Sequence, residues 1–247
     1  MKTDNGRIIH GSELTFDEKK HAYFYEGKKI PSVTTILNNV AKPVLVPWAV
    51  KMTAEYWKAK IAALKDLPSL TDIDQLYEQS KKVHRQKADH AAGIGTNVHN
   101  YAEAYFRADP LPELKTDEAK RSVEAFHKWV QETNLKVLSV ERRIFSKEYG
   151  YAGTCDLIAE FNGVIGAGDY KTSSGIFPEM RMQTAAYQHA IQEEKKIELG
   201  PRWIIRFDKV TGEFEAKKFE DFESDFMGFK GALFLHNSLQ AMKEKKK

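Results

Sequence analysis

The spacing of apolar residues changes along the chain, and each spacing predicts a different kind of structure. Residues 7–37 carry a β-rich pattern with a hairpin turn predicted at 26–29, followed by Ser32 as a candidate helix cap. From residue 46 to about residue 90, apolar residues recur at intervals of three and four, which predicts helices with a break near Pro68. Two further helices are predicted, one from Thr96 as N-cap to about Arg107 and one over about 117–133.

Beyond residue 135 the pattern becomes that of strands. Strands are predicted over 136–145, 153–161 and 163–171, and the Asn162-Gly163 pair between the last two is typical of a tight hairpin. A helix over about 178–194, two strands over 202–207 and 214–219, and a terminal helix from about 222 complete the chain. This order predicts an α/β fold with a mixed central sheet flanked by helices, preceded by a β-hairpin and a helical extension. We therefore expect two domains, 1–92 and 93–247.

Composition narrows the classes of protein that this chain can represent. A chain of 247 residues with 42% hydrophobic and 30% charged residues buries a core without help from a metal or a disulfide. The single cysteine, Cys155, rules out a disulfide within the chain and a four-cysteine metal site. The net charge of +3 permits a nucleic-acid partner without requiring one. No apolar signal region opens the sequence and no stretch approaches the roughly 20 apolar residues of a membrane span, so we expect no membrane partner and a cytoplasmic location, in a bacterium or a phage-infected host.

The candidate chemistry centres on Asp169-Tyr170-Lys171. Side chains alternate along a strand, so Asp169 and Lys171 share one face and Tyr170 takes the other. The predicted hairpin brings Asp156 antiparallel to this strand, near Asp169. Two close carboxylates repel each other, and a divalent cation such as Mg²⁺ relieves the repulsion. The alternative is a surface hairpin with scattered charges, because Asp-x-Lys alone is a common sequence.

Two helical pairs add polar groups at a spacing of four residues. His99 and Glu103 lie on one helix face, and Gln183 and Tyr187 lie on one face of the helix that follows Lys171. A histidine beside a carboxylate supplies a metal ligand and its support, while an amide and a phenol hydrogen-bond phosphate or base edges. The alternatives are an ordinary surface histidine and a core tyrosine.

In their order and spacing these residues resemble the motifs of RecB-type nucleases, which belong to the PD-(D/E)xK superfamily. The resemblance covers residues 93–190 through four motifs: Gly95-Thr96-x-x-His99-x-x-x-Glu103, Gly153-x-x-Asp156, Asp169-x-Lys171 and Gln183-x-x-x-Tyr187. The N-terminal stretch is similar to the leader of phage-type exonucleases and of the mitochondrial genome maintenance exonuclease, through His21-x-Tyr23, Gly27 and the run Pro31 to Leu37.

The resemblance implies a DNA exonuclease that depends on Mg²⁺ (or Mn²⁺) and acts on single-stranded DNA or DNA ends. It implies metal ligation by His99, Asp156, Asp169 and the backbone carbonyl of Tyr170, with Lys171 serving the attacking water. Glu103 either supports His99 or takes part in catalysis. Gln183 and Tyr187 hold the DNA strand or order the site, and further DNA contacts are assigned to Thr96, Thr172, Ser32 and Thr34.

One departure from the family pattern is informative, and several alternatives stay open. Some relatives carry four cysteines for an iron–sulfur cluster, but this chain has one cysteine, so we expect no such cluster; without a Walker A motif we also expect no nucleotide cofactor. The open alternatives are an endonuclease of the same fold and a catalytically silent DNA-binding module. We expect a role in phage recombination or DNA repair, with a recombination or replication partner. The helical extension, with Trp48, Tyr56 and Trp57, is a candidate channel for single-stranded DNA.

Overall fold

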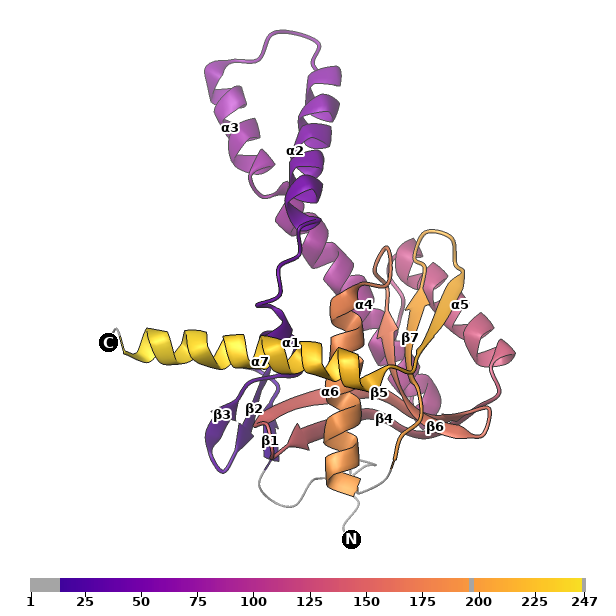
Figure 1. Ribbon diagram of the computed structural model, residues 1–247. Helices are drawn as coiled ribbons and strands as arrows, with labels where there is room; N and C mark the ends of the chain where they lie inside the picture. The colour runs from indigo at the N-terminus through magenta and orange to yellow at the C-terminus, as the bar shows by residue number, and fades with distance from the viewer. Residues whose placement is uncertain (1–13, 196–197, 246–247) are drawn as a thin grey trace. The chain divides into compact units, whose positions relative to one another are not determined.

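The computed structural model describes residues 14–195 and 198–245 (Figure 1). The part of the predicted β-rich pattern that precedes residue 14 lies outside these residues. The chain separates into two compact units. The core unit is made of two stretches of chain, one that ends at Val40 and one that begins at Asn97. The residues between them, Ala41–Thr96, form the helical unit. The domain division at residue 92 stays a prediction, while in the structure the hairpin residues from 14 onward belong to the core unit.

A five-stranded sheet organises the core unit. Its order is β4 (Leu135–Ser146), β5 (Tyr151–Phe161), β6 (Val164–Lys171), β7 (Arg202–Phe207) and β8 (Phe214–Phe219). Neighbouring strands are antiparallel except for β6 and β7, which are parallel and are joined through α6 (Pro178–Lys195). Asn162 and Gly163 form the β5–β6 turn with φ values of 50° and 87°, the left-handed conformation that two-residue hairpins require.

Helices cover both faces of this sheet. Phe126 and Trp129 of α5 (Asp117–Glu132) contact Tyr170 on one face. On the other face, α6 packs against Ile158 and Ala167 in the main hydrophobic cluster. The predicted fold class, a mixed central sheet flanked by helices and preceded by a β-hairpin and a helical extension, is therefore confirmed.

A small second sheet and a short helix attach to the edge of the core. The strands β1 (Leu14–Asp17), β2 (Ala22–Tyr25) and β3 (Lys28–Ile30) form an antiparallel sheet, with the predicted turn between the last two. Ser32 caps α1 (Val33–Leu37), since its Oγ accepts a hydrogen bond from the Thr35 backbone N–H at 3.0 Å. The Pro31 carbonyl accepts a hydrogen bond from Ala152 N–H at 3.1 Å, which ties this segment to the start of β5.

The C-terminal helix α7 (Phe222–Glu244) is fixed at its beginning by a buried ion pair. Arg202, which has no exposed surface, donates to Asp225 Oδ2 at 2.8 Å and to the Asp221 carbonyl at 2.9 Å. Its other terminal nitrogen donates to the Arg181 carbonyl at 3.2 Å, so both Nη atoms of the buried charge have acceptors. Phe226, Phe229 and their buried neighbours then pack α7 against the core cluster.

The helical unit contains α2 (Leu45–Ala62), α3 (Leu70–Ser80) and the first half of α4 (Val83–Arg107). The prediction that a helix begins at Thr96 is wrong. Thr96 lies inside α4, where its hydroxyl donates to the Ala92 carbonyl at 3.2 Å. The residues from Val83 to Ala92 include good helix formers and no proline, so Gly93 and Gly95 alone do not end the helix. None of the described helices combines the length and apolar character needed to cross a membrane.

Candidate active site

The candidate site lies where β5 and β6 part. The two strands pair as far as Leu157 and Gly168. Beyond this point the Asp156 carboxylate accepts a hydrogen bond from the Tyr170 backbone N–H at 2.7 Å. Asp156 is 6% exposed and Asp169 is 1% exposed. Both carboxylates singled out in the sequence are therefore buried at the same end of the sheet.

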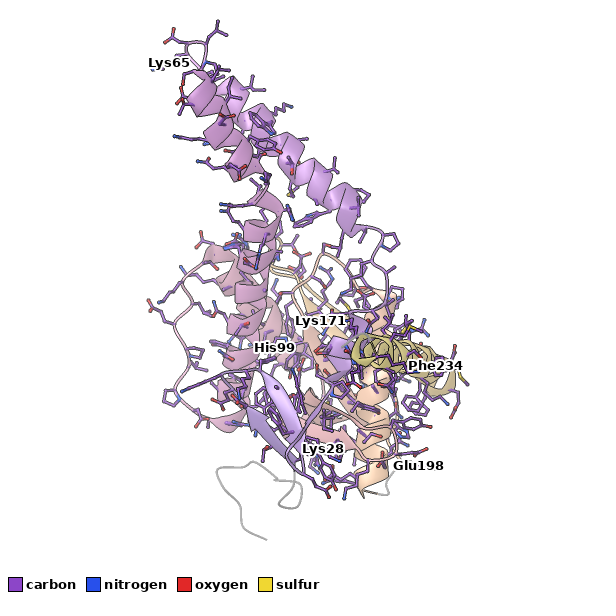
Figure 2. All side chains as sticks on the ribbon, turned by 90° about the vertical axis from the view of Figure 1, so that its left-hand side faces the viewer. Lys28, Lys65, His99, Lys171, Glu198 and Phe234 are labelled. Carbon is purple, nitrogen blue, oxygen red and sulfur yellow. The ribbon has the colours of Figure 1, made fainter. Side chains whose placement is uncertain are left out.

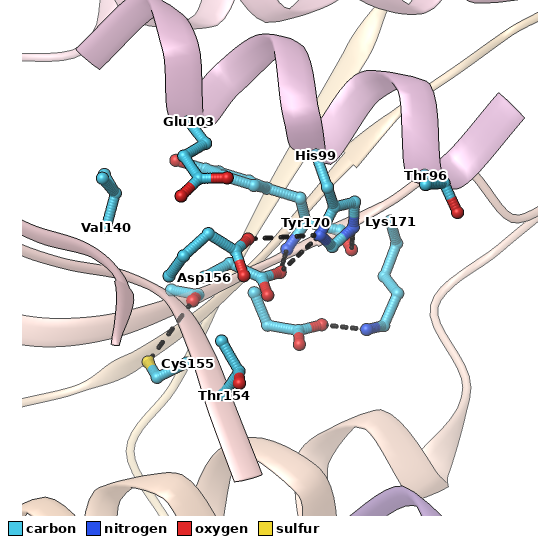
Figure 3. Close-up of polar contacts among 12 residues, drawn as sticks. Thr96, His99, Glu103, Val140, Thr154, Cys155, Asp156, Tyr170 and Lys171 are labelled. Carbon is cyan, nitrogen blue, oxygen red and sulfur yellow. Dashed lines mark hydrogen bonds and ion pairs between the residues drawn. The ribbon is translucent and has the colours of Figure 1, made fainter. Parts of the chain in front are cut away.

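His99 reaches this point from α4 (Figures 2 and 3). Its Nε2 lies 3.1 Å from the Tyr170 carbonyl oxygen, and its Nδ1 lies 3.5 Å from Asp156 Oδ2. The structure thus brings together three of the four groups to which the family resemblance assigns metal binding: the His99 imidazole, the Asp156 carboxylate and the Tyr170 carbonyl.

Glu141 of β4 belongs to the same cluster and was not predicted. Its Oε1 lies 3.8 Å from His99 Nδ1, and the ligand atoms of His99, Glu141 and Asp156 all lie within 4.8 Å of one another. Glu141 has φ of 47°, which is uncommon for a residue other than glycine. The alternation of a regular strand cannot reveal such a residue. The one signal in the sequence is the run of three charged residues, Glu141-Arg142-Arg143, in the middle of this strand.

Asp169 is held by two neighbours on the α6 side of the sheet. Its Oδ2 forms an ion pair with Lys171 Nζ, and its Oδ1 accepts a hydrogen bond from Gln183 Nε2 at 3.0 Å. The same Gln183 nitrogen donates to the Tyr187 hydroxyl at 2.8 Å. Tyr187 is only 4% exposed. Of the two roles predicted for this pair of residues, these contacts favour ordering the site over holding DNA.

The first glycine of the Gly153-x-x-Asp156 motif has a packing role. A Cβ atom at Gly153 would lie 2.9 Å from Tyr187 Cε1, closer than carbon atoms approach in proteins. Glycine at this position therefore lets Tyr187 pack against β5 and extend toward Gln183.

The protonation states of the site are set by burial and by neighbouring charges. Burial raises the pKa of Asp169 to about 6, although the Lys171 ammonium opposes this rise. Burial alone would lower the pKa of His99, but Asp156 and Glu141 together hold it well above its ordinary value. The pKa of Asp156 is lowered, because His99 and Lys171 outweigh its burial. Protonated His99 thus places a positive charge between the carboxylates of Asp156 and Glu141.

The other predicted site residues fall into two groups. Ser32, Thr34 and Glu103 line the pocket of about 580 Å³ that His99 and Asp156 also line, although Glu103 pairs with Arg107 rather than with His99. Thr96 and Thr172 are not among the described residues that line this pocket. Thr172 is 9% exposed directly after β6.

A second cluster of potential ligands has a structural explanation. Glu148, His189 and Glu193 lie close together beside the β4–β5 turn. The Glu193 carboxylate already accepts hydrogen bonds from Ser146 Oγ at 2.6 Å, from Lys147 N–H at 2.8 Å and from Glu148 N–H at 3.2 Å. These bonds fix the turn, so the carboxylate of Glu193 already has a structural role.

Comparisons with known proteins add little to the site. No protein-family model matches the chain, and no curated protein is significantly similar to it. Among solved structures, the chain is similar to LHK-Exo in complex with dAMP, with 13% sequence identity and a TM-score of 0.33 over 62% of this chain and 85% of that chain. The assignment of a function therefore depends on the site residues themselves.

We expect Mg²⁺ or Mn²⁺ to raise the melting temperature of this protein, by roughly 5–10 °C at a cation concentration about 100 times the dissociation constant. The rise should grow as the pH increases through the raised pKa of His99, above 6.5, because the cation must displace the proton from this imidazole. The stability of the metal-free protein should change with pH in the same range. Protonated His99 stabilises the metal-free fold fully below pH 6.5, and this contribution is lost as the pH rises through the raised pKa.

Differential scanning calorimetry at several pH values, with and without the cation, measures this effect. Asp169→Asn should remove the rise, whereas Glu148→Gln in the second cluster should leave it intact. A rise of equal size in the Asp169→Asn protein would show that the cation binds elsewhere.

Proposed function

We propose that this protein is a metal-dependent DNA exonuclease that hydrolyses phosphodiester bonds in single-stranded DNA or at DNA ends. The observation that carries the proposal is the convergence of His99, Asp156, Asp169 and Lys171 at one end of the sheet, beside an open pocket. These residues come from α4, β5 and β6, so their proximity is a product of the fold rather than of local sequence.

The donor atoms fit a hard divalent cation. The Asp156 and Glu141 carboxylates and the His99 imidazole, whose ligand atoms lie within 4.8 Å of one another, would hold Mg²⁺ or Mn²⁺ together with the Tyr170 carbonyl beside His99. Asp169 is proposed as a further ligand, although in the structure its carboxylate lies outside this cluster and is paired with Lys171. Cys155 is buried and is the single cysteine, so soft thiolate ligation is not available here. When bound, such a cation polarises a phosphate oxygen and lowers the pKa of a water molecule.

Lys171 serves this chemistry as a cation rather than as a base. Burial would lower its pKa, but Asp169 and Asp156 raise the pKa above its ordinary value. The side chain therefore remains an ammonium group that donates hydrogen bonds to the attacking water or to a phosphate oxygen. Such a preorganised donor stabilises negative charge as it develops in the transition state.

Gln183 and Tyr187 act through Asp169. The chain of hydrogen bonds from Tyr187 to Gln183 to Asp169 fixes the orientation of the carboxylate. Ser32 and Thr34 have hydroxyl groups at the rim of the pocket and would contact the DNA backbone. Ser32 Oγ hydrogen-bonds to the hydroxyls of both Thr34 and Thr35, which keeps these groups in place.

The helical unit is proposed to bind single-stranded DNA. Its sequence, Ala41–Thr96, contains nine basic and six acidic residues, a formal charge of +3 that equals the charge of the whole chain and leaves the remainder formally neutral. Tyr77 on α3 is 54% exposed with Lys81 over its ring. Positive charge and aromatic rings together are typical of surfaces that attract the backbone and stack on bases.

The first test is a nuclease assay with end-labelled linear single strands, linear duplexes and closed circles in Mg²⁺ or Mn²⁺. We expect the linear substrates to be degraded, the circles to survive and EDTA to stop the reaction. Asp169→Ala should slow cutting by roughly three orders of magnitude or more, while DNA binding survives or tightens because a carboxylate facing phosphate is removed. Asp169→Asn serves as a second variant that keeps the side-chain volume.

Each contrary outcome of this assay has a definite meaning. Cutting of closed circles would make the enzyme an endonuclease of the same fold. Binding without cutting under any condition would make it a catalytically silent DNA-binding module, or a nuclease that needs a recombination or replication partner. Full activity in the Asp169→Ala protein would refute the site.

Lys171→Ala should lower the single-turnover cleavage rate by roughly 100- to 1000-fold, as expected for removal of one preorganised donor. Metal binding should persist, which the melting-temperature rise reports independently. Lys218→Ala removes an exposed lysine on β8 and is the matched control. If both variants cut at the wild-type rate, charge stabilisation must come from another residue.

Trp57→Ala and Lys81→Ala together should weaken single-strand binding by roughly 10-fold or more, since base stacking contributes about 1–3 kcal/mol per base. The logarithm of the affinity should also fall less steeply with the logarithm of salt concentration than in the wild type. Fluorescence anisotropy with a labelled oligonucleotide measures both quantities. Unchanged affinity would remove the helical unit from the DNA-binding surface.

A further inference from the structure

The C-terminal helix α7 has two apolar faces, and only one of them is covered. Phe226, Phe229 and Leu233 pack into the core cluster. A second set of large apolar residues on the same helix faces outward, including Phe234, which is 76% exposed (Figure 2), and Met242, which is 60% exposed. The exposed set is Met227, Phe234, Leu235, Leu239 and Met242.

The exposed residues form one continuous stripe. At 100° per residue, positions 227, 234, 235, 239 and 242 fall within an arc of about 140°, opposite the arc of Phe226, Phe229 and Leu233. Gly231 and Ser238 lie within the same stripe. A Cβ atom placed on Gly231 would meet nothing within 4 Å, so the middle of the stripe is open to a close neighbour.

The distal end of α7 lacks support from the rest of the described chain. His236 is the last buried residue of the helix, and the helix continues for two further turns to Glu244. Helical stability in proteins comes mainly from packing of an apolar face, and short unsupported turns are marginal in water. Leu239 and Met242 on these turns are therefore expected to have a packing partner.

The spacing of the stripe indicates what this partner is. Four of its five large apolar residues pair about a point between Phe234 and Leu235: these two residues flank the point, and Met227 and Met242 are equally distant from it, as are Gly231 and Ser238. Leu239 is paired with Lys230, whose hydrocarbon stem can cover an apolar side chain. A two-fold axis through that point sets two copies of α7 antiparallel and places each residue against its counterpart. Met227 then lies opposite Met242 of the second copy over a stripe about 22 Å long.

The charges at the two ends of α7 favour the same arrangement. Glu220, Asp221 and Glu223 lie at the beginning of α7, whereas Lys243 and Lys245 flank Glu244 at its end. An antiparallel pair sets the acidic end of one helix beside the basic end of the other. A parallel pair would set like charges together at both ends, which is unfavourable.

We propose that this protein forms a two-fold symmetric homodimer in which the outer faces of two antiparallel α7 helices pack together, with Phe234 and Leu235 at the axis. The interface is isologous, so each helix supplies the same apolar stripe and the same pair of charged ends. The dimer does not use the pocket residues and is independent of the proposed nuclease activity.

Sedimentation velocity of the full chain over a wide range of concentrations tests the proposal. We expect a species of twice the 28.2 kDa monomer mass. Phe234→Glu should raise the dimer dissociation constant roughly 30-fold or more, the effect of losing an interface hot spot. Gln240→Glu adds the same charge to an exposed position on another side of α7 and should leave the dissociation constant unchanged. A monomer at every concentration, or equal effects of the two substitutions, would overturn the proposal.

Disulfide trapping tests the antiparallel register. The native Cys155 is buried and stays out of the reaction. The double substitution Met227→Cys and Met242→Cys should give a covalent dimer on mild oxidation, whereas either substitution alone should not, because each position is far from its own copy across the axis. Efficient cross-linking of the Met227→Cys single variant would indicate parallel helices and would contradict the proposed interface.

Discussion

The hydrogen bond from the Tyr170 backbone N–H to the Asp156 carboxylate determines the rest of the site. At this point β5 and β6 no longer pair, so the N–H would be left buried without a backbone partner, at a cost of about 1–3 kcal/mol. The Asp156 carboxylate accepts this N–H in place of a backbone carbonyl, and the same hydrogen bond fixes the position of the carboxylate. The same peptide segment carries the Tyr170 carbonyl toward His99 and, one residue on either side, directs Asp169 and Lys171 toward α6.

The buried charges of the site are stable only as a group. Asp156, Asp169 and Glu141 face two cations, Lys171 and protonated His99, in surroundings that penalise any unpaired charge. A divalent cation in place of the histidine proton would balance the carboxylates more completely. Carboxylates that lie this close repel one another, and a bound cation would reduce this repulsion.

The fold was largely predictable from the sequence, but the site was predictable only in part. The strand at 163–171 and the Asn162-Gly163 turn follow from alternation and turn chemistry, and these alone bring Asp156 and Asp169 to one end of the sheet. The start of α4 was mispredicted, because Thr96 has the chemistry of a cap but lies in a region whose helix propensity continues through it. Glu141 was missed, because its position depends on a left-handed residue within β4, which no periodic pattern encodes.

The contact between Gly153 and Tyr187 shows how a distant change can reach the candidate site without altering a charged group. A side chain at 153 would displace the Tyr187 ring, which holds Gln183, which in turn orients Asp169. Each hydrogen bond in this series of three side chains is easily loosened. The displacement of the Asp169 carboxylate should therefore increase with temperature. A small side chain at position 153 is therefore expected to give a protein whose site is close to normal at low temperature and disordered at a higher one.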